Sequence, residues 1–381
     1  MSSGDAHDLR KPAEPIPLTV LTGFLGAGKT TLLNRLLQDE ALADTVVIIN
    51  EFGEIGLDHL LVRAIDDNMV LLQSGCLCCT LRGDLVSALE GLLRDLDNGR
   101  LAFRRVILET TGLADPAPVL QTAMAHPYLV MRFRIDGVIT VVDAINGAAT
   151  LDQNIESLKQ VAVADRIVLA KSDLANTPER QHAKDALMAR LAALNPAAPV
   201  LDAALGEATA ARFIECGLYN PEHKIPDVKR WLAEEAYAAA AAQHHEHEHH
   251  HDPNRHDERI RAFTLATDTP IPAATFEMFI DLVCSLHGPK LLRLKGIVKI
   301  AEEPDRPLVI HGVQHVMHPP VRLEHWPDAD ERTRLVVITR DLAPETVTRL
   351  FDAFLERRAP DTPDRAALLD NPLVPFGGID R

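Results

Sequence analysis

Nine consecutive residues near the start of the chain have the pattern of a phosphate-binding loop. They separate an apolar run at 16–22 from a helix-like run at 32–37 and read Gly23-Phe24-Leu25-Gly26-Ala27-Gly28-Lys29-Thr30-Thr31. Glycines let the backbone turn so tightly that several amide N–H groups point at one anion, and the start of the following helix adds partial positive charge. We therefore expect Lys29 to reach the outer phosphates and Thr30 to offer a hydroxyl ligand to Mg²⁺. The residues predicted to hold the nucleotide here are Gly23, Gly26, Ala27, Gly28, Lys29, Thr30 and Thr31; a glycine-rich turn without a ligand is the alternative.

Three cysteines within four residues form a second group with chemical potential. Cys76, Cys78 and Cys79 follow a glycine and precede a helix predicted from about Leu81 to Leu96. Thiolates bind soft metal ions such as Zn²⁺, and a helix N-terminus favours the thiolate form. In extended backbone Cys79 would face away from the other two, so a turn is needed for all three to bind one ion. Buried small hydrophobes and a redox-sensing thiol group are the alternatives.

A closed zinc site needs four ligands, and the local sequence offers only these three thiols. We therefore expect an open or shared site, completed by water, by Glu51 or by a residue from elsewhere in the chain. Glu51 is the first choice among the acidic residues of its segment because it directly follows an apolar run at 45–50.

Acidic residues stand at the ends of apolar runs that we expect to be buried parallel strands. Glu109 ends one such run and is followed closely by Gly112. Ligands of open α/β sheets bind beyond the carboxyl ends of the strands. We predict Glu109 as a carboxylate near Mg²⁺ and the Gly112 backbone as a sensor of the γ-phosphate. Glu51 and Glu109 are the candidates for positioning the attacking water, with Glu54 and Asp58 behind them; a solvated acidic loop is the alternative for the segment around Glu51.

A lysine and an aspartate two residues apart follow the apolar run at 165–170. Lys171-Ser172-Asp173 matches the segment with which GTPases read guanine: the lysine stem packs on the purine, and the carboxylate accepts from N1–H and the exocyclic amine. Adenine lacks that pair of donors, so Lys171 and Asp173 predict GTP rather than ATP. The segment usually begins with Asn or Thr, whereas this chain has Ala170, which removes one polar contact and makes the selection of guanine less strict.

A histidine-rich run lies in the second half of the chain, after an alanine-rich stretch predicted to be helical at 229–243. Neutral imidazoles at this density bind Zn²⁺, Co²⁺ or Ni²⁺ with exchangeable geometry, which suits metal capture or buffering. A solvated linker that happens to be rich in histidine is the alternative. The predicted ligands are His244, His245, His247, His249, His250 and His251, with His256 shortly after them.

Composition limits the classes of partner. The chain has 381 residues, 46% of them hydrophobic, and a formal net charge of −16. The length favours two domains, and the negative charge argues against nucleic acid or an anionic membrane surface as a partner. No apolar run approaches the roughly 20 residues that span a bilayer, and the polar start has no signal-like core, so we expect a cytoplasmic protein. Five cysteines, three of them clustered, suit metal or redox chemistry better than a disulfide framework.

The elements that position these residues follow from the alternation of apolar runs with helix-like segments. Continuous apolar runs are typical of parallel strands buried on both faces. Such strands are expected at 16–22, 45–50, 69–72, 105–109, 136–143, 165–170 and 198–201. The predicted fold class is α/β, a three-layer P-loop NTPase domain with a mostly parallel sheet, followed by a smaller α+β domain. The predicted boundaries are 1–225 for the first domain, 226–258 for the alanine-rich helix and histidine-rich linker, 259–358 for the second domain and 359–381 for an irregular tail.

Within the second domain the same reading predicts short strands around two helices. The helices are expected at 273–284 and about 344–355. The strands are expected at 260–266, 291–300 with a break at Gly296, 308–311, 321–325 and 335–339.

With these motifs in this order, the chain resembles the CobW-type GTPases. This family of metal-chaperone and metal-insertase GTPases includes cobalamin-biosynthesis proteins, nitrile hydratase activators and zinc-regulated GTPases. The resemblance is specific because the Cys-x-Cys-Cys group lies between two nucleotide motifs. It implies a GTPase whose bound metal and nucleotide influence each other, with the three cysteines as the metal site; a histidine-rich stretch between the domains is also similar to many members. The segments that carry it are Gly23 to Thr31, Asn50 to Glu54, Gly75 to Thr80, Glu109 to Gly112, Lys171 to Asp173 and, in the second domain, Lys295-Gly296-Ile297.

The resulting hypothesis is a GTP-hydrolysing metallochaperone with GTP and Mg²⁺ in its nucleotide site. It would bind Zn²⁺, or Co²⁺ or Fe²⁺, at the three cysteines and transfer it to a client metalloprotein. Contacts to the γ-phosphate would set the geometry of the thiol site, and hydrolysis would loosen it. The alternatives are a non-hydrolysing metal buffer based on the histidine run and a nucleotide-switched partner-binding protein with a structural metal. The sequence specifies no oligomeric state.

Overall fold

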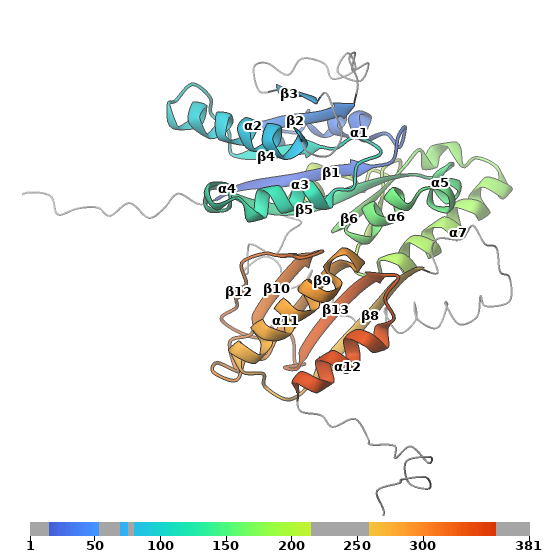
Figure 1. Cartoon of the computed structure of the whole chain (residues 1–381). Helices are drawn as coiled ribbons and strands as arrows, with labels where there is room; N and C mark the ends of the chain where they lie inside the picture. The colour runs from blue at the N-terminus through green and yellow to red at the C-terminus, as the bar shows by residue number, and fades with distance from the viewer. Residues whose placement is uncertain (1–14, 53–68, 75–79, 215–258, 356–381) are drawn as a thin grey trace, which may run out of the picture.

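The computed structural model describes residues 15–52, 69–74, 80–214 and 259–355, and these form two β-sheets with helices packed against them (Figure 1). The first sheet has seven strands and the second has six. No helix in these ranges combines the length and hydropathy of a membrane span. The boundaries predicted for domains, linker and tail stay predictions.

The first sheet is parallel at every pairing of neighbouring strands, in the order β3-β2-β4-β1-β5-β6-β7. Both faces of its strands are buried: in β2, Val46 and Ile48 belong to one core cluster, and Val47 and Ile49 belong to another. Alternate side chains of a strand point to opposite faces, which explains why these strands are continuous apolar runs. The strands are β1 (Ile16–Gly23), β2 (Thr45–Phe52), β3 (Met69–Ser74), β4 (Arg105–Glu109), β5 (Phe133–Asp143), β6 (Arg166–Ala170) and β7 (Val200–Asp202).

Helices cover both faces of this sheet, which confirms the predicted three-layer α/β fold. Two of them correspond to the helical runs after the loop and after the cysteines. The others were not predicted, since most are short and α7 buries only three residues, Leu187, Leu191 and Leu194. The helices are α1 (Lys29–Leu36), α2 (Thr80–Asp97), α3 (Ala117–Ala125), α4 (Pro127–Arg132), α5 (Gly147–Gln153), α6 (Ile155–Ala162), α7 (Pro178–Leu194) and α8 (Ala210–Phe213).

The second sheet is antiparallel, and α11 (Ala273–His287) and α12 (Pro344–Phe354) pack on one of its faces (Figure 1). Phe279 anchors this packing: its ring centroid lies 5.2 Å from that of Phe351 and 5.8 Å from that of Phe354. The predicted α+β class of this part is therefore confirmed. The strands are β8 (Ile260–Thr267), β9 (Leu291–Val298), β10 (Leu308–Val313), β11 (Val316–Met317), β12 (Val321–Arg322) and β13 (Thr333–Arg340).

Two details of the predicted second domain are wrong. Strand β9 runs through Gly296 without the predicted break, and it pairs with β10 and β13 on both sides of that glycine. A Cβ at Gly296 would overlap the side chain of Leu335 and lie 2.9 Å from the carbonyl oxygen of Arg334, so the glycine gives room to β13. The strand expected at 321–325 is limited to the two residues of β12.

The two sheets are joined by packing and by buried charge. Leu158 and Val161 of α6 share a core cluster with Leu292 of β9 and Ile338 of β13. Beside this cluster, Asp165 pairs with Arg293 and Lys295 of β9. The described part of the chain therefore contains a buried interface between the nucleotide-binding sheet and the second domain.

Candidate functional site

The predicted phosphate loop lies between the end of β1 and the start of α1, at the carboxyl edge of the parallel sheet. Gly28 caps the helix with φ 100°, a left-handed conformation that favours glycine. Gly23 has φ 142°, and a Cβ there would overlap the carbonyl oxygen of Val141 in β5. Backbone conformation and crowding therefore account for glycine at these two positions, and the strand-loop-helix context is the one that a phosphate loop requires.

Lys29 and Thr30 extend from the first turn of α1. The Lys29 ammonium donates to the carbonyl oxygens of Gly23 at 2.8 Å and Phe24 at 3.2 Å, so the side chain lies across the phosphate loop. Thr30 Oγ1 donates to Glu109 Oε1 at 2.8 Å. Glu109 is buried at the end of β4, beside Leu21 of β1 in the sheet register.

A hydroxyl and a carboxylate in contact beside a phosphate loop suit Mg²⁺, which prefers oxygen ligands and is held by similar pairs in P-loop proteins. The structure thus brings together three residues that the sequence predicted, Lys29, Thr30 and Glu109. Their chemical roles stay predictions, but the donor set fits the ion.

The segment after Glu109 is bound to the strand that leads into the loop. Thr110 donates its N–H to the carbonyl oxygen of Leu21 at 2.9 Å and its hydroxyl to Thr22 Oγ1 at 2.8 Å. Two residues later, a Cβ added to Gly112 would lie 2.5 Å from the backbone nitrogen of Leu25. Gly112 therefore lies directly against the phosphate loop, and its contact with a γ-phosphate stays a prediction.

Lys171 crosses the other side of the loop. Its ammonium donates to the carbonyl oxygen of Gly26 at 2.6 Å and to Asp143 Oδ2 at 2.8 Å. Asp143, the last residue of β5, also accepts the backbone N–H groups of Ile145 and Asn146. Burial raises the pKa of Asp143, but these hydrogen bonds, with that of Lys171 foremost, leave it below its usual value.

Asp143 is a site residue that the sequence analysis missed. It ends a run that was itself predicted as a strand, so its position at a strand end was the available signal. Asp173 is exposed, two residues beyond Lys171.

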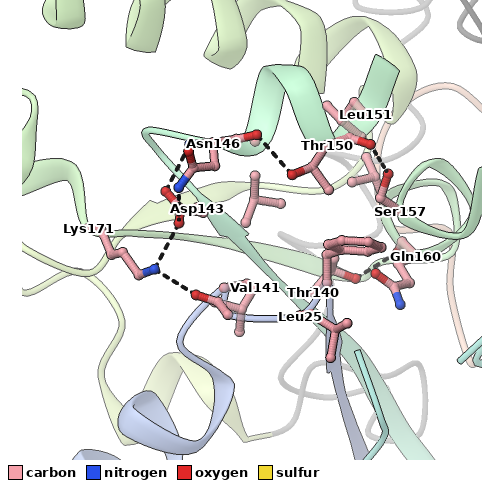
Figure 2. Close-up of a pocket in the computed structure, with 16 residues that line it drawn as sticks. Leu25, Thr140, Val141, Asp143, Asn146, Thr150, Leu151, Ser157, Gln160 and Lys171 are labelled. Carbon is pink, nitrogen blue, oxygen red and sulfur yellow. Dashed lines mark hydrogen bonds and ion pairs between the residues drawn. The ribbon is translucent and has the colours of Figure 1, made fainter. Parts of the chain in front are cut away.

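A cavity of about 290 Å³ adjoins the phosphate loop (Figure 2). One wall is formed by residues 24–27 of the loop, and the others by residues 140–143 of β5 and by α5 and α6, with Gln160 on α6. Lys171 closes one end beside Asp143, whereas Lys29 and Thr30 do not line the cavity. The cavity thus lies beside the loop rather than at the side where the predicted Mg²⁺ ligands meet.

The remaining predicted residues lie partly or wholly outside the described residues. Glu51 lies in β2, where its backbone is in register with Gln73 of β3, but its side chain is outside the description. Within the described ranges, no cluster of three or more His, Cys, Asp or Glu side chains could hold a metal ion. The predicted residues that lie outside these ranges are Cys76, Cys78, Cys79, Glu54, Asp58 and the histidines His244, His245, His247, His249, His250, His251 and His256.

Comparison with known proteins agrees with this architecture over both domains. Residues 17–202 match the CobW/HypB/UreG nucleotide-binding domain, and residues 260–355 match the cobalamin synthesis protein cobW C-terminal domain. The zinc chaperone YjiA of Escherichia coli (strain K12) is 33% identical over 340 residues, which are 88% of this chain and 98% of the relative. The chain belongs to the CobW family. The predicted family and the GTPase class are thereby confirmed, and the chain is a P-loop GTPase of this family.

Other members support the assignment over most of the chain. The zinc chaperone CobW of Sinorhizobium sp is 30% identical over 357 residues, which cover 85% of this chain and 92% of the relative. Among solved structures, the Zn(II)-bound YjiA GTPase from E. coli superposes with a TM-score of 0.61 at 29% identity, covering 90% of this chain and 99% of that one. Both domains of this CobW-family chain therefore have counterparts in the same relatives.

Proposed function

We propose that this CobW-family protein is a GTP-hydrolysing metallochaperone that carries zinc at Cys76, Cys78 and Cys79 and passes it to a client metalloprotein. The names of its relatives, zinc chaperones among them, support Zn²⁺ as the cargo. The phosphate loop would bind GTP, and the Thr30–Glu109 pair would bind Mg²⁺. The client is a protein whose own metal site takes up the zinc.

The position of the thiol segment in the chain carries this proposal. Residues 75–79 directly follow β3 and precede α2. Because β3 and β1 are parallel strands of one sheet, their carboxyl ends reach the same edge as the phosphate loop. This strand order supports the proposal that metal and nucleotide bind at the same end of one sheet, where contacts to a γ-phosphate would alter the thiol segment through the intervening strands.

Hydrolysis at this site needs positioning and charge more than covalent chemistry by the protein. Bound Mg²⁺ supplies positive charge that offsets the charge developing on the transferred phosphoryl group. Lys29 and the loop amides bind the phosphates, and Glu109 orients the Thr30 hydroxyl toward the ion. Glu51 and Glu109 remain the candidates for orienting the water.

Guanine recognition falls to Lys171 and Asp173. The ammonium of Lys171 is held by Gly26 and Asp143, which supports our proposal that its stem packs on the purine beside the loop. The exposed carboxylate of Asp173 is available to accept from the guanine N1–H and amine. We propose GTP as the substrate, with the missing Asn or Thr at Ala170 making the discrimination against ATP less strict.

The test is the affinity for Zn²⁺ measured with and without a non-hydrolysable GTP analogue and Mg²⁺. For the parent protein we expect the analogue to change the zinc Kd by roughly 5–150-fold, the usual range of coupling between sites. Lys29→Ala should abolish that change because it removes the phosphate contact. The exposed Lys290→Ala variant in the second domain is the matched control and should keep it. Equal zinc affinity with and without the analogue in the parent would overturn the proposal.

Two further measurements separate the alternatives. Deletion of residues 244–256 should leave GTP-dependent zinc release intact; its loss would favour a histidine-based buffer. Alkylation of the thiols should release zinc without unfolding the protein, whereas unfolding would favour a structural metal. The assay uses a Cys216→Ser variant, so that Cys284 is the one thiol outside the cluster. Burial, with help from Asp281, raises the pKa of the Cys284 thiol to about 11, which disfavours the reactive thiolate at neutral pH.

A further inference from the structure

Gln160 connects helix α6 to the segment that follows Glu109. Its side chain is buried, and Nε2 donates to the carbonyl oxygens of Gly112 at 3.3 Å and Ala114 at 3.0 Å. The backbone of Gln160 is held in turn by β5, because Thr140 Oγ1 donates to its carbonyl oxygen at 2.7 Å (Figure 2). A rigid strand thus supports the residue that binds the segment.

The neighbouring residue of α6 binds the same segment at its far end. Lys159 forms an ion pair with Asp115 at 2.9 Å, and the other oxygen of Asp115 accepts the N–H of Ala117 at the start of α3. Two successive residues of α6 therefore hold residues 112–115 from one side. The phosphate loop lies on the other side, where Gly112 is too close to Leu25 for any side chain.

The hydrogen bonding of Gln160 points to a positional role. Because Nε2 serves two carbonyl groups, the orientation of the amide is determined, and Oε1 is buried without a hydrogen-bond partner among the residues that the structure describes. A buried unsatisfied oxygen costs free energy, and such groups call for an explanation beyond folding. The two hydrogen bonds that Nε2 donates to residues 112 and 114, the sensor segment, provide that explanation.

We infer that Gln160 is a positioning residue for the γ-phosphate: it fixes residues 112–114 so that the backbone of Gly112 meets the terminal phosphate of GTP. The inference rests on the proposed role of Gly112 in the nucleotide site. GDP has no γ-phosphate and does not need this contact. Loss of the two bonds should therefore weaken GTP binding and hydrolysis while GDP binding is retained.

The test compares Gln160→Met, which keeps the length but has no donor, with Gln160→Glu, which turns an acceptor toward the two carbonyl groups. For each, the Kd of GDP and of a non-hydrolysable GTP analogue, kcat and KM are measured. We expect GDP binding within about twofold of the parent, and analogue binding and kcat lowered about tenfold or more by the loss of two buried hydrogen bonds. Gln160→Glu should show the larger loss.

Gln121→Met is the matched control, because Gln121 is also a buried glutamine of this domain but bonds to Gln314 of the second domain. It should keep the parent ratio of GDP to analogue affinity. A merely structural role of Gln160 would lower thermal stability and change both affinities together, and that result would overturn the inference. If the Gln160 variants fail to fold, Thr140→Val, which removes only the bond to the Gln160 backbone, must show the same selective loss in milder form or the inference falls.

The outcomes also separate this inference from the proposed function. A parent protein that binds no nucleotide would refute both. A parent that hydrolyses GTP but shows no coupling to zinc would refute the metallochaperone proposal alone. The role of Gln160 would still be decided by the ratio of GDP to GTP-analogue affinity in the Gln160 variants.

Discussion

Gly112 shows at the scale of one residue how space decides a residue type. Its α-carbon lies so close to the phosphate loop that a methyl group would be 2.5 Å from the nitrogen and 2.7 Å from the α-carbon of Leu25. Neither contact can be relieved by rotating a side chain, because both atoms belong to the backbone. The loop and the sensor segment must separate for any larger residue to fit.

Gly112→Ala is therefore expected to lower the free energy of unfolding by about 1–3 kcal/mol, the usual cost of overpacking. It should also weaken the binding of the GTP analogue more than the binding of GDP. Gly91→Ala is the control: Gly91 lies within α2 with nothing near the added carbon, so alanine should stabilise by roughly 0.5–1 kcal/mol. Urea unfolding and nucleotide titration of both variants measure these effects. Equal stability of the two variants would show that the phosphate loop can move away from residue 112 at little cost in free energy.

At the scale of elements, the contact between the start of β6 and the middle of β9 joins the domains. Asp165 lies just before β6. Its Oδ1 accepts hydrogen bonds from Arg293 and, at 2.6 Å, from Lys295. Its Oδ2 accepts the backbone N–H of Val138. Burial by itself raises the pKa of Asp165, but the charges of Arg293 and Lys295 keep it well below its usual value. The carboxylate is thus a negative charge shared by two buried cations.

Asp165→Ala should cost about 3–5 kcal/mol in the free energy of unfolding, because it leaves two buried cations without their common partner. The comparison is Asp97→Ala at the end of α2, which breaks a solvent-exposed pair with Arg132 and should lower the free energy of unfolding far less. Chemical unfolding of both variants under the same conditions measures the difference. A cost for Asp165→Ala as small as that of the control would mean that apolar packing alone joins the domains.

At the scale of the whole molecule, two histidines make the stability of this junction depend on pH. His311 of β10 and His318 stack with ring centroids 4.8 Å apart, and both are buried. Burial, reinforced by Arg293 and Lys295 and opposed by Asp165, lowers the pKa of His318 to about 4; burial and Arg293 foremost lower that of His311 well below 6.5. The folded protein therefore holds both rings neutral where the unfolded chain protonates them.

We expect stability to be constant with respect to these groups above about pH 6.5 and to fall as the pH drops from there toward 4. Only the unfolded state takes up protons in that window, so each histidine lowers the free energy of unfolding by up to about 1.4 kcal/mol per pH unit. Unfolding with urea between pH 7 and pH 5 measures this slope. His318→Phe, which keeps a ring in the stack, should flatten it, while the exposed His325→Gln should not; an unchanged slope in His318→Phe would contradict the assignment.

The same junction shows why a change at the nucleotide site can reach the second domain. Helix α6 binds residues 112–115 with Lys159 and Gln160 and packs Leu158 and Val161 against β9 and β13. A shift of this helix would therefore move residues 112–115 and also disturb its packing against β9 and β13. The sequence marked the second domain only as a small α+β unit, because the segment singled out there, Lys295-Gly296-Ile297, gives no sign of what it contacts.

Local pattern was enough to predict the family and the fold class, and it selected Lys29, Thr30 and Glu109, which the structure brings together. The strand runs are continuous because both faces of the sheet are buried, and the loop pattern is strict because Gly23 and Gly28 occupy conformations that favour glycine. Both properties leave a pattern in consecutive residues of the chain, so the pattern can be read without the fold. The contact between Thr30 and Glu109 was also foreseeable, because parallel strands bring their carboxyl ends to one edge.

Only the tertiary structure decided which side chains support that core. Lys171 meets Asp143 across 28 positions, Gln160 meets Gly112 across 48 and Lys295 meets Asp165 across 130. Each contact depends on strand order and helix placement, which no local spacing encodes. The sequence by itself therefore determined what chemistry the site contains, and the fold determined what holds it in place, because a hydrogen bond or ion pair acts over a few ångströms whatever the distance along the chain.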